Sequence, residues 1–351
     1  MYSSRAYRPS RRGFTAHSRR THALGAYVLL TLVAVLLITA VYTVIDNGRV
    51  IVREQTVTIS NLPAALEGYT ILQISDLAGV RIGPKQRAVR QALAKKTYHV
   101  VCMTGDMIGP ARDPQPFYEL ISVLDPTKPM FFIAGDGDPS PFPEEGTYSL
   151  GILADYITGA QSHGAVYLSG TTGVTYRGQN VWFSPSENLL LNLSETETSL
   201  GNELSRAFES SQSSRTSQEL EYRLEVLSKE QATRAQIQPG DLHIVLSHRP
   251  LDDSYVSILQ TMASESSPFY RSIGLILAGH YAGGQWRLPF LGPIYARPQG
   301  FFPEDIDGLT VAGSYTQYIS RGIGNASDTP FPRFRLFNAP EISLIRLTSA
   351  L

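Results

Sequence analysis

Five short apolar segments of this 351-residue chain each end in an aspartate or a histidine. A short, continuously apolar run is typical of a strand that is buried on both faces of a parallel sheet. The residues that follow such strands meet along one edge of the sheet, so we expect their side chains to converge around Asp106. The segments are residues 71–76, 99–106, 130–136, 242–248 and 273–280.

The stretches between these segments carry helical patterns, which gives a β-α-β-α-β order along the chain. This order favours a mainly parallel α/β domain with right-handed crossovers. Helices are expected at residues 84–96, 116–124 and 148–162. Strands are expected at residues 51–59 and 341–347, with several short strand-like pieces in 166–191.

The N-terminal part has an uneven distribution of charge. Residues 1–22 contain six arginines and no acidic residue, and residues 23–45 contain no charged residue. A cleaved signal peptide would have a shorter apolar core, of about 7 to 15 residues, followed by a small-residue cleavage site. We therefore expect a basic arm at 1–22 and a retained single-pass membrane anchor at 23–45. The positive-inside rule places the N-terminus in the cytoplasm and a domain at 50–351 on the extracytoplasmic side.

Net charge, cysteine content and one polar segment give further information on function. The formal net charge is −1 at pH 7, which gives no indication of nucleic-acid binding. Cys102 is the only cysteine, and its place in an apolar segment is typical of a small core residue. Residues 193–238 form a polar insertion in which Leu220, Leu224 and Leu227 predict one amphipathic helix. This insertion is a candidate surface for a protein partner.

The five segments also contain short motifs in a fixed order. They are ISD ending at Asp76, TGD ending at Asp106, AGDGD at 134–138, LSHRP at 246–250 and AGHYAGGQ at 278–285. This series resembles the calcineurin-like metallophosphoesterases. The pieces that resemble their membrane-anchored bacterial branch are RLPFLGPIYARPQGFF (287–302), YISRGIG (318–324) and FNAPEISLIRL (337–347). The resemblance implies two packed sheets flanked by helices, and a two-metal site that hydrolyses phosphoesters.

The motifs depart from the family pattern at four positions. Ala78 and Ala282 occupy positions at which the family has histidine ligands. Gly137 occupies the position of the family histidine that protonates or stabilises the departing oxygen. Asp136 replaces an asparagine ligand and keeps an oxygen donor.

These departures affect the two metals of the family differently. By resemblance, one metal would be bound by Asp76, Asp106 and two positions that are now alanine. The other metal would be bound by Asp106, Asp136, His248 and His280, all of which carry donors. Two carboxylates and two imidazoles suit manganese, zinc or iron. The resemblance therefore predicts one divalent metal, with Asp76 as a further candidate ligand, rather than two metals.

The loss of three histidines predicts weak or no hydrolysis, because general acid–base assistance typically contributes about 10²–10⁴-fold. Asp138, Arg81 and Tyr281 are the candidates for a remaining catalytic role, and Arg81 could hold a phosphate oxygen. The favoured function is an impaired homologue that binds one metal and a phosphorylated small molecule or lipid head group. The alternatives are an active mononuclear phosphoesterase and a cell-surface scaffold.

Residues 286–302 are unusually apolar, and they allow two interpretations. Most such side chains belong to a core. The alternative is a rim that touches the bilayer or an acyl chain, because the anchor would hold the domain close to the membrane. The apolar residues are Trp286, Phe290, Leu291, Ile294, Tyr295, Phe301 and Phe302.

Overall fold

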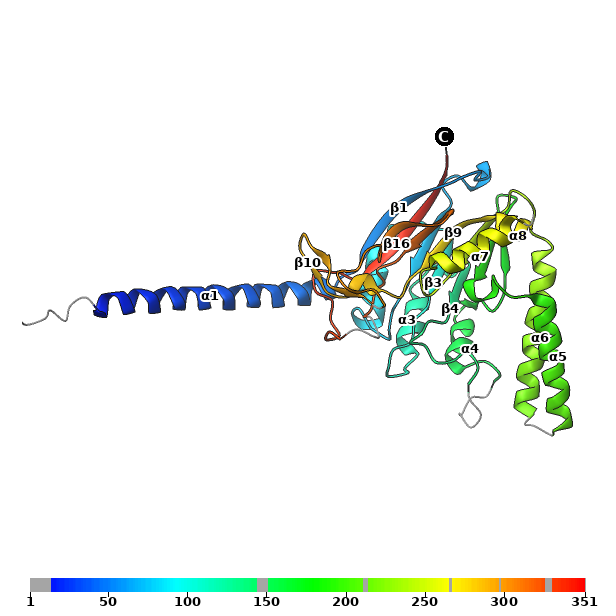
Figure 1. Ribbon diagram of the computed structural model, residues 1–351, viewed down its shortest axis with the longest axis horizontal. Helices are drawn as coiled ribbons and strands as arrows, with labels where there is room; N and C mark the ends of the chain where they lie inside the picture. Colours follow the sequence, from blue (N-terminus) through cyan, green and yellow to red (C-terminus); the bar gives the residue numbers. More distant parts are fainter. Residues whose placement is uncertain are drawn as a thin grey trace, which may run out of the picture. The chain divides into compact units, whose positions relative to one another are not determined.

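The computed structural model describes residues 14–350 apart from 144–150, 211–213, 265–266, 297 and 326–329. The chain divides into two units, residues 1–46 and residues 47–351. Helix α1 (Phe14–Asn47) makes up the described part of the first unit and ends at the first residue of the second (Figure 1). Its segment Leu24–Asn47 has a mean hydropathy of 2.7. It is long and apolar enough to cross a membrane, a property shared by signal sequences near an N-terminus.

The first of two six-stranded sheets contains most of the strands from the N-terminal half of the domain. In spatial order its strands are β1 (Ile51–Ile59), β16 (Glu341–Ser349), β2 (Thr70–Ile74), β3 (Val100–Thr104), β4 (Met130–Ile133) and β5 (Val166–Tyr167). β2 to β5 are parallel, whereas β16 runs parallel to β1 and antiparallel to β2. All five residues of β3 are buried, which accounts for its continuously apolar sequence.

The second sheet is also mainly parallel. Its spatial order is β14 (Gly308–Ala312), β15 (Tyr315–Ile319), β9 (Ile273–Ala278), β8 (Leu242–Leu246), β7 (Gln179–Pro185) and β6 (Thr172–Tyr176). The four central strands are parallel, and the two edge strands β14 and β6 pair antiparallel. The short strands expected within 166–191 are therefore confirmed as β5, β6 and β7.

The two sheets pack face to face over a shared apolar core. Val100 and Phe131 of the first sheet belong to the same buried cluster as Phe183, Ile244 and Leu275 of the second. The rings of Phe131 and Phe183 are 4.8 Å apart between centroids. Burial of this continuous apolar surface is the main favourable contribution to the fold.

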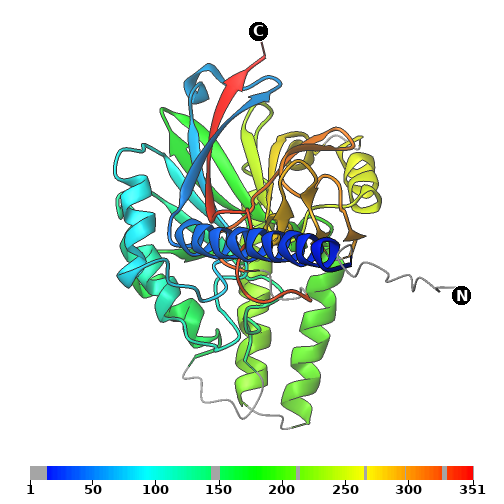
Figure 2. The ribbon, with the colours of Figure 1, turned by 90° about the vertical axis from the view of Figure 1, so that its left-hand side faces the viewer.

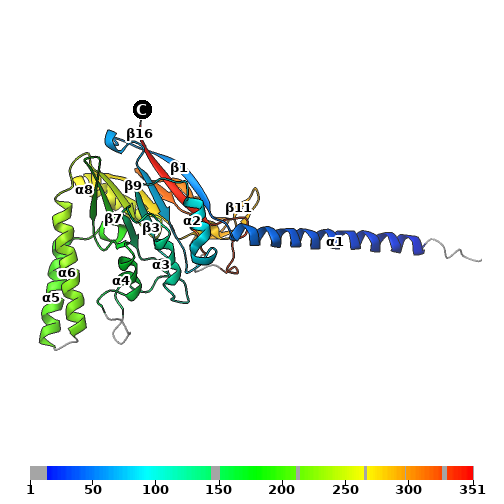
Figure 3. The ribbon, with the colours of Figure 1, turned by 180° about the vertical axis from the view of Figure 1, so that it is seen from behind.

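Helices cover the outer faces of both sheets (Figures 2 and 3). The first sheet is covered by α2 (Arg87–Leu93), α3 (Gln115–Ser122) and α4 (Asp155–Ser162). The second is covered by α7 (Asp253–Ser264) and α8 (Pro268–Arg271). Short 3₁₀ helices occur at η1 (Ala64–Leu66), η2 (Pro84–Gln86), η3 (Ser186–Asn188) and η4 (Ala282–Gly284). Two packed sheets flanked by helices confirm the predicted fold class.

Two helical predictions need correction. The helix expected at 148–162 begins only at Asp155, and residues 148–150 of that prediction lie outside the described residues. The polar insertion contains two helices rather than one, α5 (Leu193–Glu209) and α6 (Ser214–Arg234), which pack against each other as a hairpin (Figure 2). Asn192 caps α5 by accepting a hydrogen bond from the Glu195 backbone N–H at 3.2 Å.

The apolar stretch 286–302 forms two small hairpins. Their strands are β10 (Arg287–Leu288), β11 (Gly292–Pro293), β12 (Tyr295–Ala296) and β13 (Gly300–Phe301). Four large side chains here are exposed, so the core interpretation is wrong for them; they are Phe290, Leu291, Phe301 and Phe302. Trp286 is half-buried, and its ring stacks on that of Phe331 at 4.6 Å.

Candidate metal centre

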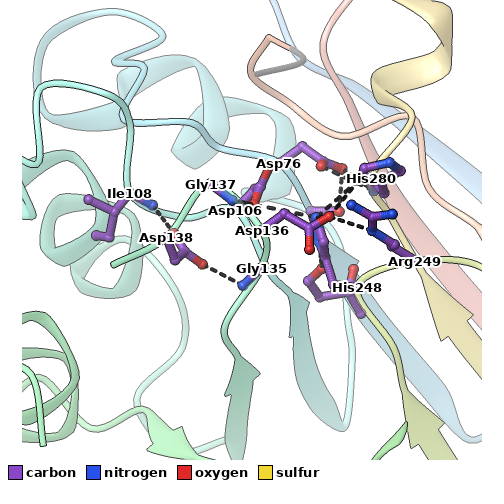
Figure 4. Close-up of polar contacts among 12 residues, drawn as sticks. Asp76, Asp106, Ile108, Gly135, Asp136, Gly137, Asp138, His248, Arg249 and His280 are labelled. Atoms are coloured by element: carbon purple, nitrogen blue, oxygen red, sulfur yellow. Dashed lines mark hydrogen bonds and ion pairs between the residues drawn. The ribbon is translucent and has the colours of Figure 1, made fainter. Parts of the chain in front are cut away.

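The predicted ligands all follow strands whose carboxyl ends meet at one edge of the sandwich. Asp76, Asp106 and Asp136 follow β2, β3 and β4 of the first sheet, while His248 and His280 follow β8 and β9 of the second. Figure 4 shows the five side chains converging. The expectation that the strand-end residues lie together is therefore correct, and the cluster contains residues from both sheets.

His248 lies at the centre of this cluster. Its Nδ1 lies 3.0 Å from the backbone oxygen of Thr104, which assigns Nδ1 as the protonated donor. The other ring nitrogen, Nε2, faces the cluster. It lies 3.4 Å from Asp106 Oδ1, 3.6 Å from Asp136 Oδ2 and 3.3 Å from His280 Nδ1. Nε2 is therefore the only ring nitrogen of His248 available as a metal ligand.

Two overlapping groups of side chains have the geometry of a metal site. One consists of Asp136, His248 and His280, and the other of Asp76, Asp106 and His248. Within each group the ligand atoms lie within 4.8 Å of one another. Both groups use His248, so both depend on the same nitrogen atom.

The electrostatics of the cluster reflect closely spaced carboxylates in a buried setting. Burial raises the pKa of Asp76 to about 7, although its carboxylate accepts hydrogen bonds from the Ser75 hydroxyl and, at 3.1 Å, from the His280 backbone N–H. Burial alone would lower the pKa of His248. The neighbouring carboxylates of Asp76 and Asp106 outweigh that effect, so the pKa of His248 lies above its ordinary value. A divalent cation is the charge that such a cluster would accommodate.

The backbone around the cluster adopts conformations that ordinary residues rarely take. Asp76, Asp106 and His280 have φ angles of 53°, 55° and 77°. Gly105 has φ 87°, and a Cβ atom there would lie only 2.6 Å from His248 Nδ1. Positive φ values at non-glycine residues cost free energy, and they concentrate where side chains must point in a set direction.

The positions of the three missing histidines are occupied by tightly packed backbone. Ala78 donates its N–H to the Asp106 carbonyl oxygen at 2.7 Å, and Ala282 is fully buried. Gly137 donates its N–H to Asp106 Oδ1 at 2.7 Å. A Cβ atom at position 137 would lie 3.2 Å from both carboxylate oxygens of Asp106, so a larger residue there requires Asp106 to shift.

The three candidates for a remaining catalytic role have different surroundings. Both oxygens of Asp138 accept backbone hydrogen bonds, from Ile108 at 2.6 Å and from Gly135 at 2.8 Å, so this carboxylate holds loops in place (Figure 4). Burial raises its pKa to about 6. Tyr281 is partly buried, and the centroid of its ring lies 5.3 Å from that of the His280 ring. Its catalytic role stays a prediction.

Arg81 is engaged in a different set of contacts. Its Nε lies 2.9 Å from one carboxylate oxygen of Glu119 and 3.1 Å from the other. A second ion pair joins it to Asp113 at 3.6 Å. These ion pairs engage the guanidinium, and the role of Arg81 in holding a phosphate oxygen stays a prediction.

Two residues beside the cluster escaped the sequence reasoning. Arg249 pairs with Asp136 through Nε at 2.5 Å, and its place directly after His248 was the only signal for it. Glu187 follows β7, lies close enough to His248 and Asp136 to interact with both charges, and has its pKa raised by burial. No motif marks Glu187, because only the fold brings the end of β7 beside the ends of β4 and β8.

No family model matches the chain. Over 77 residues, or 22% of its length, the chain is 39% identical to the uncharacterized metallophosphoesterase YkuE of Bacillus subtilis (strain 168), and the match spans 25% of that relative. Among solved structures, phosphopantetheinyl hydrolase (PptH) from Mycobacterium tuberculosis aligns with a TM-score of 0.35 and 13% identity, covering 72% of this chain and 89% of PptH. The chain is thus similar over part of its length to a metallophosphoesterase, and its two packed sheets flanked by helices are consistent with that type of fold.

Proposed function

We propose that the protein is a membrane-anchored metallophosphoesterase homologue that binds one divalent metal and a phosphorylated ligand, with weak or no hydrolysis. The metal would be manganese, zinc or iron, bound by Asp106, Asp136, His248 and His280, with Asp76 nearby. The ligand would be a phosphorylated small molecule or a lipid head group. Residues 50–351 would form the ligand-binding domain, and residues 193–238 its insertion.

The sharing of His248 by both ligand groups is the observation that carries this proposal. Its Nδ1 is committed to the Thr104 carbonyl oxygen, so only Nε2 remains as a donor. One nitrogen lone pair binds one metal ion, and therefore the two groups compete for a single ion. Two carboxylates and two imidazoles around that ion match the donor preferences of zinc, manganese and iron.

The surroundings of the cluster support phosphate binding more clearly than hydrolysis. A divalent ion at this site would polarise a phosphoryl oxygen and lower the pKa of a bound water. The guanidinium of Arg249, next to Asp136, is suitably charged to contact a phosphate oxygen. The imidazole of position 137 is absent, and Asp138 is engaged by backbone N–H groups. General acid assistance to the leaving oxygen would therefore be missing.

Hydrolysis of bis(4-nitrophenyl) phosphate with added manganese tests the catalytic part. The full chain in lipid nanodiscs should show little turnover above buffer, while manganese should still increase its affinity for inorganic phosphate. Turnover that disappears in Asp106→Ala would instead favour the active mononuclear phosphoesterase. If the protein bound neither manganese nor phosphate, the scaffold alternative would be favoured, and the proposal would be wrong.

Contacts within the second unit connect its first residue to the apolar stretch 286–302. Asn47, the first residue of that unit, exchanges two hydrogen bonds with the backbone of Arg335, at 2.7 and 2.9 Å. The next residue, Leu336, forms a β-bridge with Trp286, where the apolar stretch 286–302 begins. An anchor at 23–45 would therefore tether the domain beside its exposed apolar side chains. The rim interpretation of this stretch is the one we favour.

A further inference from the structure

A cavity of about 560 Å³ opens beside the metal cluster, between the ends of β4, β5 and β7 and the α5–α6 hairpin. Asp136 and His248 line it on the side of the cluster. On the side of the hairpin and the loop after β4, its described lining includes Phe142, Leu191, Leu200, Tyr222, Val226 and Leu227. A volume of this size is in the range of small-molecule sites, and continuity with the ligand cluster makes it an extension of that site.

The polar side chains in the cavity wall are largely hydrogen-bonded within the protein. Glu230 accepts hydrogen bonds from the Thr171 backbone N–H at 2.5 Å and from the Thr171 hydroxyl at 2.8 Å, and its other contact is with Arg234 at 2.7 Å. Asn188 donates to the Ser169 carbonyl oxygen at 2.8 Å. The cavity therefore presents a ligand mainly with aliphatic and aromatic carbon.

The charges in the wall disfavour a second phosphate or a nucleotide polyphosphate. Arg223 is the one lysine or arginine among the described residues that line the cavity, and its guanidinium lies over the Phe142 ring, 4.5 Å from the centroid. Phe142 also packs edge-on against Tyr222 at 6.0 Å, so these rings already have partners within the protein. Glu187 adds a carboxyl group between the cluster and the apolar wall.

We propose that the ligand is a phosphoester with an apolar chain, whose phosphate lies at the metal cluster and whose chain lies between the sheet edge and the α5–α6 hairpin. The placement of the phosphate rests on the proposed function. The placement of the chain rests on the cavity alone. The hairpin would then serve as one wall of a ligand site, which gives the insertion 193–238 a role other than recruiting a protein.

Chain length is the variable that tests this inference. Ethyl, butyl and hexyl phosphate would be titrated calorimetrically against the full chain in nanodiscs, with empty nanodiscs as the blank, with and without manganese. Each buried methylene favours binding, so the Kd should fall by about 100-fold from ethyl to hexyl phosphate. Equal affinity for the three compounds would overturn the inference.

A filled cavity should remove this dependence without removing the phosphate site. In Val226→Trp, hexyl phosphate should bind no more tightly than ethyl phosphate. Ser228→Trp, at an exposed position on the same helix, is the matched control and should retain the full dependence. If Val226→Trp fails to fold, as judged by circular dichroism, Leu200→Trp fills the cavity from α5. An undiminished chain-length dependence in the folded Trp variant would overturn the placement.

Photocrosslinking locates the chain without any variant. A hexyl phosphate with a terminal diazirine should label residues of α5 or α6, and labelling confined to 286–302 or to other surfaces would overturn the inference.

Added phosphatidic acid in the nanodisc should compete with hexyl phosphate if the natural ligand is a membrane lipid, and should have no effect if the natural ligand is a soluble phosphoester. Should manganese fail to improve the binding of ethyl phosphate while chain length still matters, the proposed function fails and the apolar site stands.

Discussion

The imidazole of His248 is oriented by a contact with the backbone of Thr104, and our proposal of a single metal ion rests on this contact. The Nδ1–H group donates to the Thr104 carbonyl oxygen, so Nε2 is the ligand atom that His248 offers to both candidate metal groups. One group contains Asp136 and His280, and the other contains Asp76 and Asp106. His243, five residues earlier on β8, has both nitrogens engaged in the core, with Ser184 Oγ at 2.7 Å and the Phe269 carbonyl oxygen at 2.9 Å. His243 lies within β8 and His248 follows its end, and this difference in position separates a structural histidine from a candidate ligand.

His243 should make the protein less stable in mild acid. Burial lowers its pKa from 6.5 to about 4, with Glu230 and Arg234 as the charged groups facing it. In this range the unfolded chain binds a proton that the folded chain does not, so the free energy of unfolding falls as pH drops from 6.5 toward 4. The loss attributable to His243 approaches about 3 kcal/mol. His243→Gln should remove this part of the pH dependence.

The control for this prediction is His163→Gln, at an exposed position, which should keep the part of the pH dependence that belongs to His243. The measurement is the denaturation midpoint of each full chain at several pH values. Asp76 and Asp138 have raised pKa values and act with the opposite sign, but they are present in every variant, so the difference isolates His243. Identical profiles for wild type and His243→Gln would contradict the prediction.

At the scale of elements, strands that are buried along their whole length could be predicted from the sequence, whereas elements with mixed burial could be predicted only in part. The β2, β3 and β8 strands are buried along their whole length, so their apolar runs identified both the strands and the carboxylates and imidazoles at their ends. The α5–α6 hairpin exposes most of its surface and contains few large apolar residues, so only part of it was recognised. Contacts between elements, such as that of Arg249 with Asp136, could not be predicted from the sequence because only the fold brings these residues together.

Glu230 should be the main polar contact that holds α6 to the sheet. Glu230 is buried, and it bonds to Thr171, directly before β6, as well as to Arg234. Glu230→Ala removes the acceptor of the Thr171 backbone N–H and the carboxylate that pairs with Arg234, and it should lower the free energy of unfolding by about 3 kcal/mol. Glu225→Ala, which removes an exposed pair with Lys229 at the same helical spacing, should have a far smaller effect because solvent screens that pair. Equal losses in chemical denaturation would contradict this prediction.

At the scale of the whole molecule, the exposed apolar loops allow the membrane proposal to be measured directly. The chain has two tryptophans: Trp182 is buried, with Nε1 bonded to Asp241 at 2.8 Å, and Trp286 is half-buried at the start of the apolar stretch 286–302. In nanodiscs with brominated acyl chains, the fluorescence of Trp286 should be quenched. Trp286→Phe should lose this quenching and Trp182→Phe should keep it. Unquenched fluorescence in the wild type would refute the rim interpretation.

For the whole molecule, we propose that the cluster of Asp76, Asp106, Asp136, His248 and His280 holds one metal ion rather than two. Elemental analysis of the full chain in nanodiscs, loaded with manganese, zinc or iron and then desalted, tests it most directly. We predict close to one equivalent of metal per chain, retained in His163→Ala and lost in His248→Ala. Two equivalents in the wild type, or one equivalent that survives His248→Ala, would contradict the account.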